Sequence, residues 1–288
     1  MRHAFLIIAH DNPEILYAQL EALDSENNDF YYHLDKRMNI NKMDLERYAK
    51  KSKIYYVNPQ KIYWGHYSQV ECELRLLETA LNNRTKYDYY HLLSGVDMPL
   101  KSCQDIHAFF KKNNGKEYIH FDEKTVDENI RERISMYHLF PGRENWQRRL
   151  NGIFIKIQKF MKIDRLKKLQ WKVQKGANWF SITDTLAQDI IKNKDKIKKQ
   201  FRYSFCGDEV FLQTYVFNSE YCSKLYSDKF DNDYHACMRL IDWKRGSPYI
   251  FGMDDWKELI ECDYIFARKF DYIQKPEIVD KLKEYLKQ

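Results

Sequence analysis

Glycine is scarce in this chain, with 9 among 288 residues. Neither GxGxxG nor GxxxxGKS/T occurs, so the sequence lacks both of the glycine-rich loops that hold phosphates with backbone N–H groups. Their absence excludes a dinucleotide fingerprint and a P-loop. If the protein binds a nucleotide, we expect side chains to hold its phosphates.

Metal-binding and disulfide patterns are missing as well. The six cysteines, at 72, 103, 206, 222, 237 and 262, form no CxxC pair, and the histidines do not cluster. We therefore expect neither a zinc site nor a disulfide framework. This cysteine usage fits a reducing compartment.

Long hydrophobic runs are absent too. The apolar stretch AFLIIA near the N-terminus is too short to span a bilayer, and no cleavage signal follows it. We expect a cytoplasmic protein with no membrane-crossing segment.

Positive charge and aromatic side chains are what the chain has in excess. The formal net charge is +6, which suits an anionic ligand or an anionic membrane surface but falls short of a dedicated nucleic-acid binder. Aromatic residues make up 16%, and they either stack on sugar faces or fill strands. The length fits one domain over residues 1–288.

Apolar runs typical of strands alternate with helical patterns through the first hundred residues. The runs cover residues 3–10, 30–37, 53–59 and 87–95. This alternation predicts an α/β fold with a mostly parallel central sheet flanked by helices. Ligands of such sheets bind beyond the carboxyl ends of the strands, so polar and aromatic residues that follow the strands are expected to converge. These are His10, Asp35, Trp64 and Asp97.

The second half of the chain contains a basic amphipathic segment, residues 142–175. Eleven Lys and Arg residues face only two acids, Glu144 and Asp164, and isoleucines and tryptophans interleave with them. Such a segment either lies on an anionic membrane surface or packs on the domain with a solvated basic face. Both interpretations remain open. Just before it, residues 128–140 either face an acceptor or form a solvated charged helix face.

The segment from Tyr203 to Ser219 is the candidate for the chemistry. Gly207 and Asp208 indicate a helix start, with the Asp208 side chain as cap, so Glu209 is expected in the first helical turn. A carboxylate held there in a fixed direction can act as a general base. Alternatively, it only stabilises the helix N-terminus electrostatically.

Eight stretches resemble the core-2/I-branching enzyme family, which includes β-1,6-N-acetylglucosaminyltransferases and peptide O-xylosyltransferases. In chain order they are IIAHDNP, HLDKR, WGHYSQVECELRLLETAL, HLLSGVDMPLKS, NWFSIT, DEVFLQT, MRLIDWKRGSP and FARKFD. The resemblance extends from about residue 3 to 272. It implies a GT-A-like, Rossmann-type nucleotide-sugar-binding fold, a UDP-sugar donor, inversion at the anomeric carbon, and no divalent metal.

The resemblance also implies roles for single residues. Glu209 matches the catalytic base, Asp35 the uridine-contacting aspartate, and Arg245 and Lys269 the cations on the diphosphate, with Lys244 a competitor for Arg245. The implied donor-binding residues are Ala9, His10, Asp35, Trp64, Arg245 and Lys269; those assigned to the acceptor are Arg131, Arg133, Tyr137 and Trp179. The alternatives are a turn salt bridge for Asp35, a turn cation for Arg245 and a strand-edge charge for Lys269. Asp231-Asn232-Asp233, the only D-x-D, is interpreted as a polar turn because it lies far from the early strands.

We therefore expect residues 1–122 to bind the nucleotide sugar and residues 123–288 to bind the acceptor and carry the base. The expected protein is a bacterial enzyme that transfers N-acetylglucosamine, β-linked, to a saccharide or lipid-linked saccharide of a capsule or lipo-oligosaccharide. It would be cytoplasmic, with peripheral contact at the inner face of the membrane. The alternatives are another donor, UDP-xylose, UDP-glucuronate or UDP-galactose, or a non-catalytic glycan-binding or membrane-scaffold protein.

Overall fold

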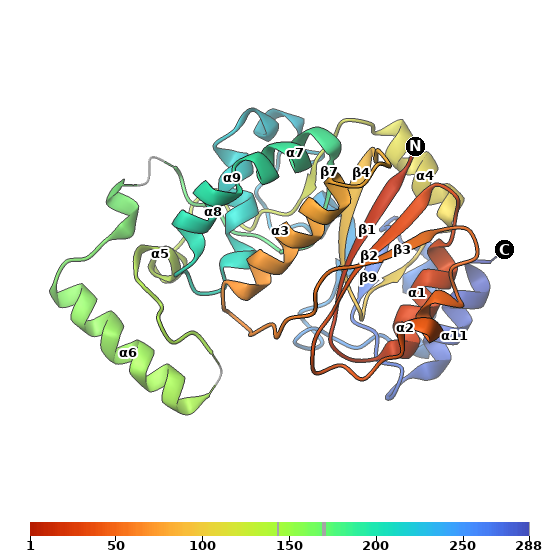
Figure 1. Ribbon diagram of the computed structural model, residues 1–288, viewed down its shortest axis with the longest axis horizontal. Coiled ribbons are helices and arrows are strands. Elements are labelled where there is room, and N and C mark those ends of the chain that lie inside the picture. The colour runs from red at the N-terminus through yellow and green to blue at the C-terminus, as the bar shows by residue number, and fades with distance from the viewer. Residues whose placement is uncertain (143, 169–170, 288) are drawn as a thin grey trace.

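The computed structural model describes residues 1–142, 144–168 and 171–287, and its main feature is a six-stranded mixed sheet (Figure 1). The spatial order is β3-β2-β1-β4-β7-β6. The first four strands in this order are parallel, whereas β7 runs antiparallel to both β4 and β6. The strands are β1 (His3–Ala9), β2 (Asn28–Leu34), β3 (Lys53–Tyr56), β4 (Tyr89–Ser94), β6 (Tyr118–Ile119) and β7 (Phe180–Thr183).

Helices cover both faces of this sheet (Figure 1). Successive side chains of β1 point to opposite faces, so Leu6 joins one core cluster while Phe5 and Ile7 join the other. Burial on both faces explains why β1 is apolar throughout. One face packs on α3 (Ser68–Leu81), α7 (Asp184–Lys192) and α9 (Phe211–Phe217), and the other on α1 (Pro13–Leu23) and α4 (Cys103–Lys112).

A second, three-stranded sheet lies beside the first. Its order is β5 (Met98–Pro99), β9 (Phe266–Arg268), β8 (Arg239–Ile241), with β8 parallel and β5 antiparallel to β9. A third core cluster joins this sheet to α10 (Trp256–Glu261), α11 (Pro276–Tyr285) and the outer side of α1.

The remaining helices lie at the periphery. They are α2 (Lys42–Glu46), α5 (Glu128–Ser135), α6 (Asn145–Phe160) and α8 (Lys194–Phe201). Figure 1 shows α5 and α6 reaching away from the sheet, with α6 the outermost element on that side. No helix in the described ranges is long and apolar enough to cross a bilayer.

The predicted α/β fold with a mostly parallel central sheet is confirmed, while its details differ in two ways. The strands end earlier than the apolar runs. β2 ends at Leu34 and β3 at Tyr56, whereas the runs extend to residues 37 and 59. In addition, the two late strands β8 and β9 pair with each other in a second sheet and not with the central one. Of the basic segment 142–175, residues 143, 169 and 170 lie outside the described residues. The division of the chain at residue 122 into a nucleotide-sugar part and an acceptor part stays a prediction.

Arg239 fastens the small sheet to the large one. Its side chain is buried, and its guanidinium donates to the carbonyl oxygens of Cys237 (2.7 Å) and Phe180 (3.0 Å) and to Ser181 Oγ (3.0 Å). It also lies 4.3 Å from the ring centroid of Phe266. Burial lowers the pKa of Arg239 to about 10, so the group remains charged at neutral pH. This side chain therefore links β8 and β9 to β7.

Replacing Arg239 tests this link. Arg239→Leu removes three hydrogen bonds and leaves buried acceptors unpaired, so we expect the free energy of unfolding to fall by about 2–4 kcal/mol in chemical denaturation. Arg47→Leu is the control, because Arg47 is exposed and pairs with Asp44 at 3.2 Å on the surface. Its loss should cost less than about 1 kcal/mol. Equal losses in the two variants would contradict the linking role.

Candidate active site

A polar groove lies beyond the carboxyl ends of β1, β2 and β4. It consists of two adjoining cavities of about 480 and 500 Å³, which share five lining residues. Those shared residues are Trp64, Gln69, Asn178, Trp179 and Arg268. The first cavity reaches the strand ends, and the second reaches the turn that carries Glu209. This is the edge where parallel sheets of this kind hold their ligands.

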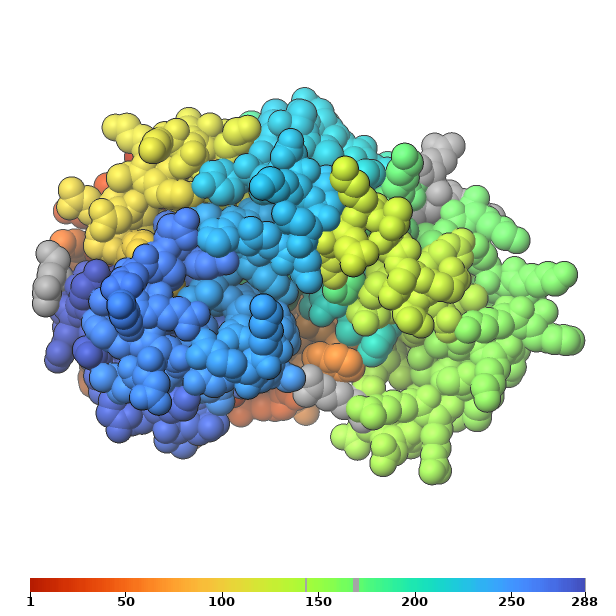
Figure 2. All heavy atoms as spheres, turned by 180° about the vertical axis from the view of Figure 1, so that it is seen from behind, coloured from red at the N-terminus to blue at the C-terminus, as the bar shows by residue number. Residues whose placement is uncertain are grey.

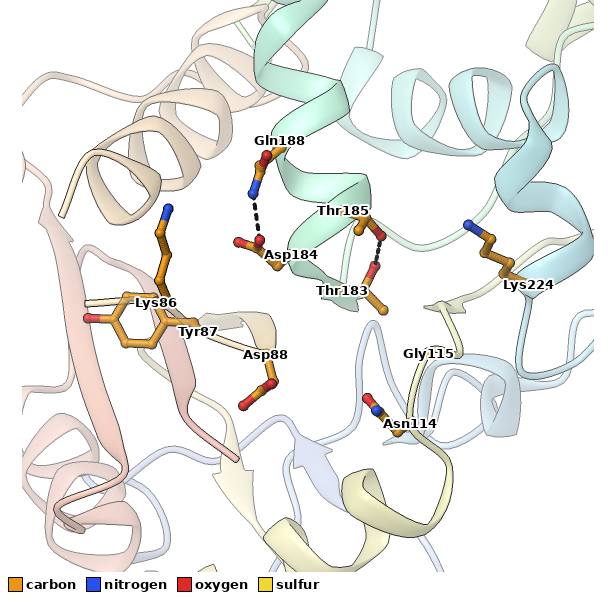
Figure 3. Close-up of a pocket in the computed structure, with 10 residues that line it drawn as sticks. All are labelled: Lys86, Tyr87, Asp88, Asn114, Gly115, Thr183, Asp184, Thr185, Gln188 and Lys224. Atoms are coloured by element: carbon orange, nitrogen blue, oxygen red, sulfur yellow. Dashed lines mark hydrogen bonds between the residues drawn. The ribbon is translucent and has the colours of Figure 1, made fainter. Parts of the chain in front are cut away.

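Another cavity, of about 540 Å³, lies where β4 begins and β7 ends (Figure 3). Polar side chains there pair with one another, as between Gln188 and Asp184 and between Thr183 and Thr185. None of the residues predicted to bind donor or acceptor lines it. The groove at the opposite end of the sheet is therefore the candidate active site.

The strand-end part of the groove contains four predicted donor residues. Ala9, His10, Asp35 and Trp64 all line it. The Trp64 ring packs edge-on against Phe205, with 5.3 Å between the ring centroids. Asp97, by contrast, is buried under the turn after β4, where it accepts from the Ser94 amide and hydroxyl. It braces that turn and does not line the groove, so of the four residues expected to converge at the strand ends, His10, Asp35 and Trp64 do so and Asp97 does not.

Asp35 is already engaged within the protein. One carboxylate oxygen accepts from Arg37 Nε at 2.7 Å, and the other accepts from the Ile62 amide at 2.9 Å. Burial alone would raise the pKa of Asp35, but the hydrogen bonds from Arg37 and the Ile62 amide lower it well below its usual range. Asp35 therefore forms the turn salt bridge with Arg37 and also lines the groove.

Arg268, which sequence reasoning did not select, is the cation at the centre of the groove. It lines both cavities, stacks over the ring of Trp179 at 4.1 Å, and lies 3.6 Å from Asp97. Burial lowers the pKa of Arg268, and the charge of Asp97 offsets part of this effect. A strand alternates its side chains between two faces, so in FARKFD only one of two adjacent cations faces the groove. This alternation of side chains is the feature of the sequence that could have pointed to Arg268 in place of Lys269.

The two predicted diphosphate cations do not line the groove. Arg245 is ion-paired with Asp242, Asp255 and Glu258, and lies over the Tyr249 ring at 4.2 Å. Lys269 follows Arg268 directly, and its backbone bonds to the 249–251 segment. The structure therefore brings Arg268, and neither Arg245 nor Lys269, to the cavities.

Glu209 lines the groove, but the helix start around it differs from the prediction. Glu209 ends a short 3-10 turn, Gly207–Glu209, and α9 begins only at Phe211 because Val210 departs from helical geometry. Asp208 does not cap this turn; its carboxylate accepts from Gln69 Nε2 at 2.8 Å instead. The Glu209 carbonyl accepts from the Gly176 amide at 3.0 Å, so the turn is tied to the segment that leads into β7.

Arg133 orients the Glu209 side chain. One of its terminal guanidinium nitrogens lies 3.0 Å from Glu209 Oε2, and both side chains are partly exposed. Arg131 instead pairs with Asp164 at 2.7 Å, and the Tyr137 ring lies under Arg165 at 4.9 Å. Of the four residues predicted on the acceptor side, the structure therefore brings Trp179 into the groove and Arg133 to its candidate base.

Two further carboxyl groups lie beneath the groove. Asp208 and Glu73 are buried, and neither oxygen of Glu73 has a hydrogen-bond partner within the described ranges. Burial and the nearby charge of Glu209 raise the pKa of Asp208 to about 7. Burial and the charge of Asp208 raise the pKa of Glu73 well above its ordinary value. The neutral form of Glu73 is therefore favoured, which limits the negative charge under an anionic ligand.

The D-x-D sequence forms a turn at the rim of the groove. Asp231 accepts from the Asp233 amide, Asp233 accepts from the His235 amide, and Asn232 lines the second cavity. Among residues 1–142, 144–168 and 171–287, no three His, Cys, Asp or Glu side chains are grouped so that they could hold a metal ion. The turn itself agrees with its interpretation from the sequence.

Similarity to known proteins identifies the family of this chain. The model of the Core-2/I-Branching enzyme family matches residues 3–257. The chain belongs to this family. Among core-2/I-branching relatives, xylosyltransferase 2 of Canis lupus familiaris is 24% identical over 99% of this chain, and xylosyltransferase oxt of Drosophila pseudoobscura pseudoobscura is 23% identical over 99%. The chain spans about a third of the length of these relatives, 34% and 33%.

A solved structure, the apo form of mouse xyloside xylosyltransferase 1, is similar to 93% of this chain. The two share 10% sequence identity, the match covers 97% of the mouse chain, and the TM-score is 0.40. This likeness is too low to bear on the core-2/I-branching site. The predicted family is confirmed by the family match alone.

The raised pKa of Asp208 makes stability depend on pH. The folded protein keeps this proton up to about pH 7, whereas the unfolded chain loses it near 3.8, so the free energy of unfolding should fall as pH rises between these values. Asp208→Asn keeps an acceptor for Gln69 but cannot titrate. Urea denaturation between pH 5 and pH 8 should therefore show a smaller fall in the variant. Identical pH slopes would mean that Asp208 is ionised throughout.

Proposed function

We propose that this protein is an inverting, metal-independent glycosyltransferase that moves a sugar from a UDP-sugar to a saccharide acceptor. The observation that carries this is a shared groove: Glu209, a candidate base, and Arg268, a partly buried cation, line the same cavity, and this cavity adjoins the one at the strand ends. Family membership supplies the reaction class. The strand-end part, with Ala9, His10, Asp35 and Trp64, takes the uridine and ribose.

In the proposed reaction, an acceptor hydroxyl oxygen attacks the anomeric carbon of the donor sugar. As the new carbon–oxygen bond forms, Glu209 takes the hydroxyl proton and the bond from the anomeric carbon to the diphosphate oxygen breaks, releasing UDP. The guanidinium of Arg133 holds the Glu209 carboxylate toward the groove. One direct displacement of this kind inverts the anomeric configuration.

The departing diphosphate needs positive charge. We assign this role to Arg268, with Lys269 as the alternative that the family resemblance implies, because a fixed cation in a partly dehydrated groove stabilises charge that develops on the leaving group. Such a cation takes the place of a divalent metal, so transfer should persist in EDTA. Arg245 is paired with three carboxylates, so we assign it the role of stabilising the loop between β8 and α10.

For the transferred sugar we propose N-acetylglucosamine, in β-linkage, with xylose as the second candidate because the relatives named above are xylosyltransferases. A panel of UDP-sugars that includes UDP-glucuronate and UDP-galactose, read by UDP release, separates these donors. The proposed acceptor is a saccharide or lipid-linked saccharide of a surface glycan, capsule or lipo-oligosaccharide, reached from the inner face of the membrane. Absence of UDP binding in calorimetry would favour a non-catalytic glycan-binding or scaffold protein.

Glu209→Gln tests the base. The amide cannot accept the proton, so we expect transfer to fall by roughly 10²–10⁴-fold. Affinity for UDP should stay unchanged, since Glu209 lies in the part of the groove away from the strand ends. Glu220→Gln is the matched control, because Glu220 is exposed and begins the 3-10 turn that follows α9. A Glu209→Gln enzyme that turns over at the wild-type rate would remove Glu209 from the mechanism.

Arg268→Gln and Arg245→Gln distinguish the two assignments of the diphosphate cation. Loss of a charge-assisted contact should weaken UDP binding by roughly 10- to 100-fold in Arg268→Gln, as measured by calorimetry. Arg245→Gln should lower thermal stability with little change in UDP affinity, because its partners are carboxylates of this chain. The opposite pattern would restore Arg245 to the role that the family resemblance implied.

A further inference from the structure

Helix α6 packs with its polar side inward and its apolar side toward solvent. Gln158 is buried and bonds through both amide atoms to the backbone of Tyr137, at 2.8 and 3.0 Å. Asn151 bonds to His138 Nδ1 at 3.0 Å. These positions are seven residues apart, two helical turns, so they share one face of the helix. Polar contacts therefore attach α6 to the rest of the protein.

The opposite side of the helix is an exposed apolar stripe. Five of its members recur at spacings of four and three residues, so they align along one face. The stripe consists of these five exposed side chains, Trp146, Leu150, Ile153, Ile157 and Phe160, and of the exposed Met161, which directly follows the helix. Phe160 is 90% exposed. Contiguous exposed apolar patches of this kind are uncommon on proteins without a partner surface.

The charge around the stripe identifies the partner. Helix α6 contains Arg148, Arg149, Lys156 and Lys159 and no acidic residue. Arg149 and Lys156 are seven positions apart and border the stripe, while Lys159 turns to Glu132 at 2.7 Å. An apolar face flanked by cations is the pattern of helices that lie in the interface of an anionic bilayer.

The shape of the molecule agrees with this pattern. Figures 1 and 2 show α6 at the outer edge of the molecule, where its side chains reach into solvent away from the body. We call α5 and α6 together the arm. Because α6 lies at the outer edge of the molecule, it can lie flat on a bilayer. The arm also leads to the catalytic groove, because α5 precedes α6 and carries Arg133, which holds Glu209.

We propose that the stripe on α6 is a membrane-docking surface that binds anionic phospholipid bilayers. Docking through this arm brings the Glu209 end of the groove close to the membrane, which favours an acceptor carried on a lipid. The docking surface stands on the geometry of α6 alone; the statement about the acceptor rests on the proposed function.

The test is co-sedimentation of the full chain with vesicles of phosphatidylglycerol and phosphatidylcholine, compared with phosphatidylcholine alone. We expect binding to the anionic vesicles, weakened by salt. Ile157→Ser with Phe160→Ser should weaken it roughly tenfold or more, and Arg149→Gln with Lys156→Gln should remove most of the preference for anionic lipid. The control is Ile273→Ser, since Ile273 is 82% exposed on another surface and should be neutral.

Several results would overturn the proposal. One is a wild-type chain that does not sediment with anionic vesicles; another is an Ile157→Ser, Phe160→Ser variant that binds them as well as the control. Sedimentation velocity provides the third: if these substitutions abolish self-association without changing vesicle binding, the stripe is an interface between copies. UDP calorimetry separates this test from the transferase proposal, because the arm variants should bind UDP like the wild type whether or not they bind vesicles.

Discussion

The candidate site depends on how the small sheet is docked against the large one. Arg239 makes that contact, since its buried guanidinium bonds across from β8 to Phe180 and Ser181 of β7. Trp179 immediately precedes β7 and Arg268 ends β9, so the same junction brings the guanidinium of Arg268 over the indole of Trp179. The groove is therefore a space between two sheets, and its central cation is placed by backbone geometry. Such placement suits a chain with few glycines, because in the proposed function side chains, and not a glycine-rich loop, hold the phosphates.

The charges around the groove are arranged to favour an anionic ligand. Asp35 is neutralised by Arg37, and Lys175 is paired with Asp122. Glu73 and Asp208 have raised pKa values because burial disfavours their ionised forms. Glu209 differs from them, since it is partly exposed and its partner is a guanidinium. The proposed base is thus partly exposed and held by a cation, while its buried neighbours contribute less negative charge than their number suggests.

The arm formed by α5 and α6 connects the groove at Glu209 to the exposed apolar stripe on α6. Arg133 on α5 contacts Glu209, and α6 begins ten residues after α5 ends, at the outer edge of the molecule. The helix is held by side-chain amides, from Gln158 and Asn151, so its apolar residues remain available. The proposed docking surface and the proposed lipid-carried acceptor therefore both belong to the Glu209 end of the groove.

Local periodicity determined the architecture and several site positions. Four apolar runs separated by helical patterns required an α/β sheet with its ligand edge after His10 and Asp35, and the structure has this sheet. Tertiary packing decided what local pattern leaves open. Adjacent strand residues face opposite ways, so FARKFD alone did not select Arg268 over Lys269; the docking of β9 beside Trp179 did. Likewise, the pattern of 142–175 specified an amphipathic helix, but whether its apolar face is buried depends on which side finds partners, and here Gln158 and Asn151 face inward. Sequence periods specify faces, whereas contacts between residues far apart in the chain determine where each face points.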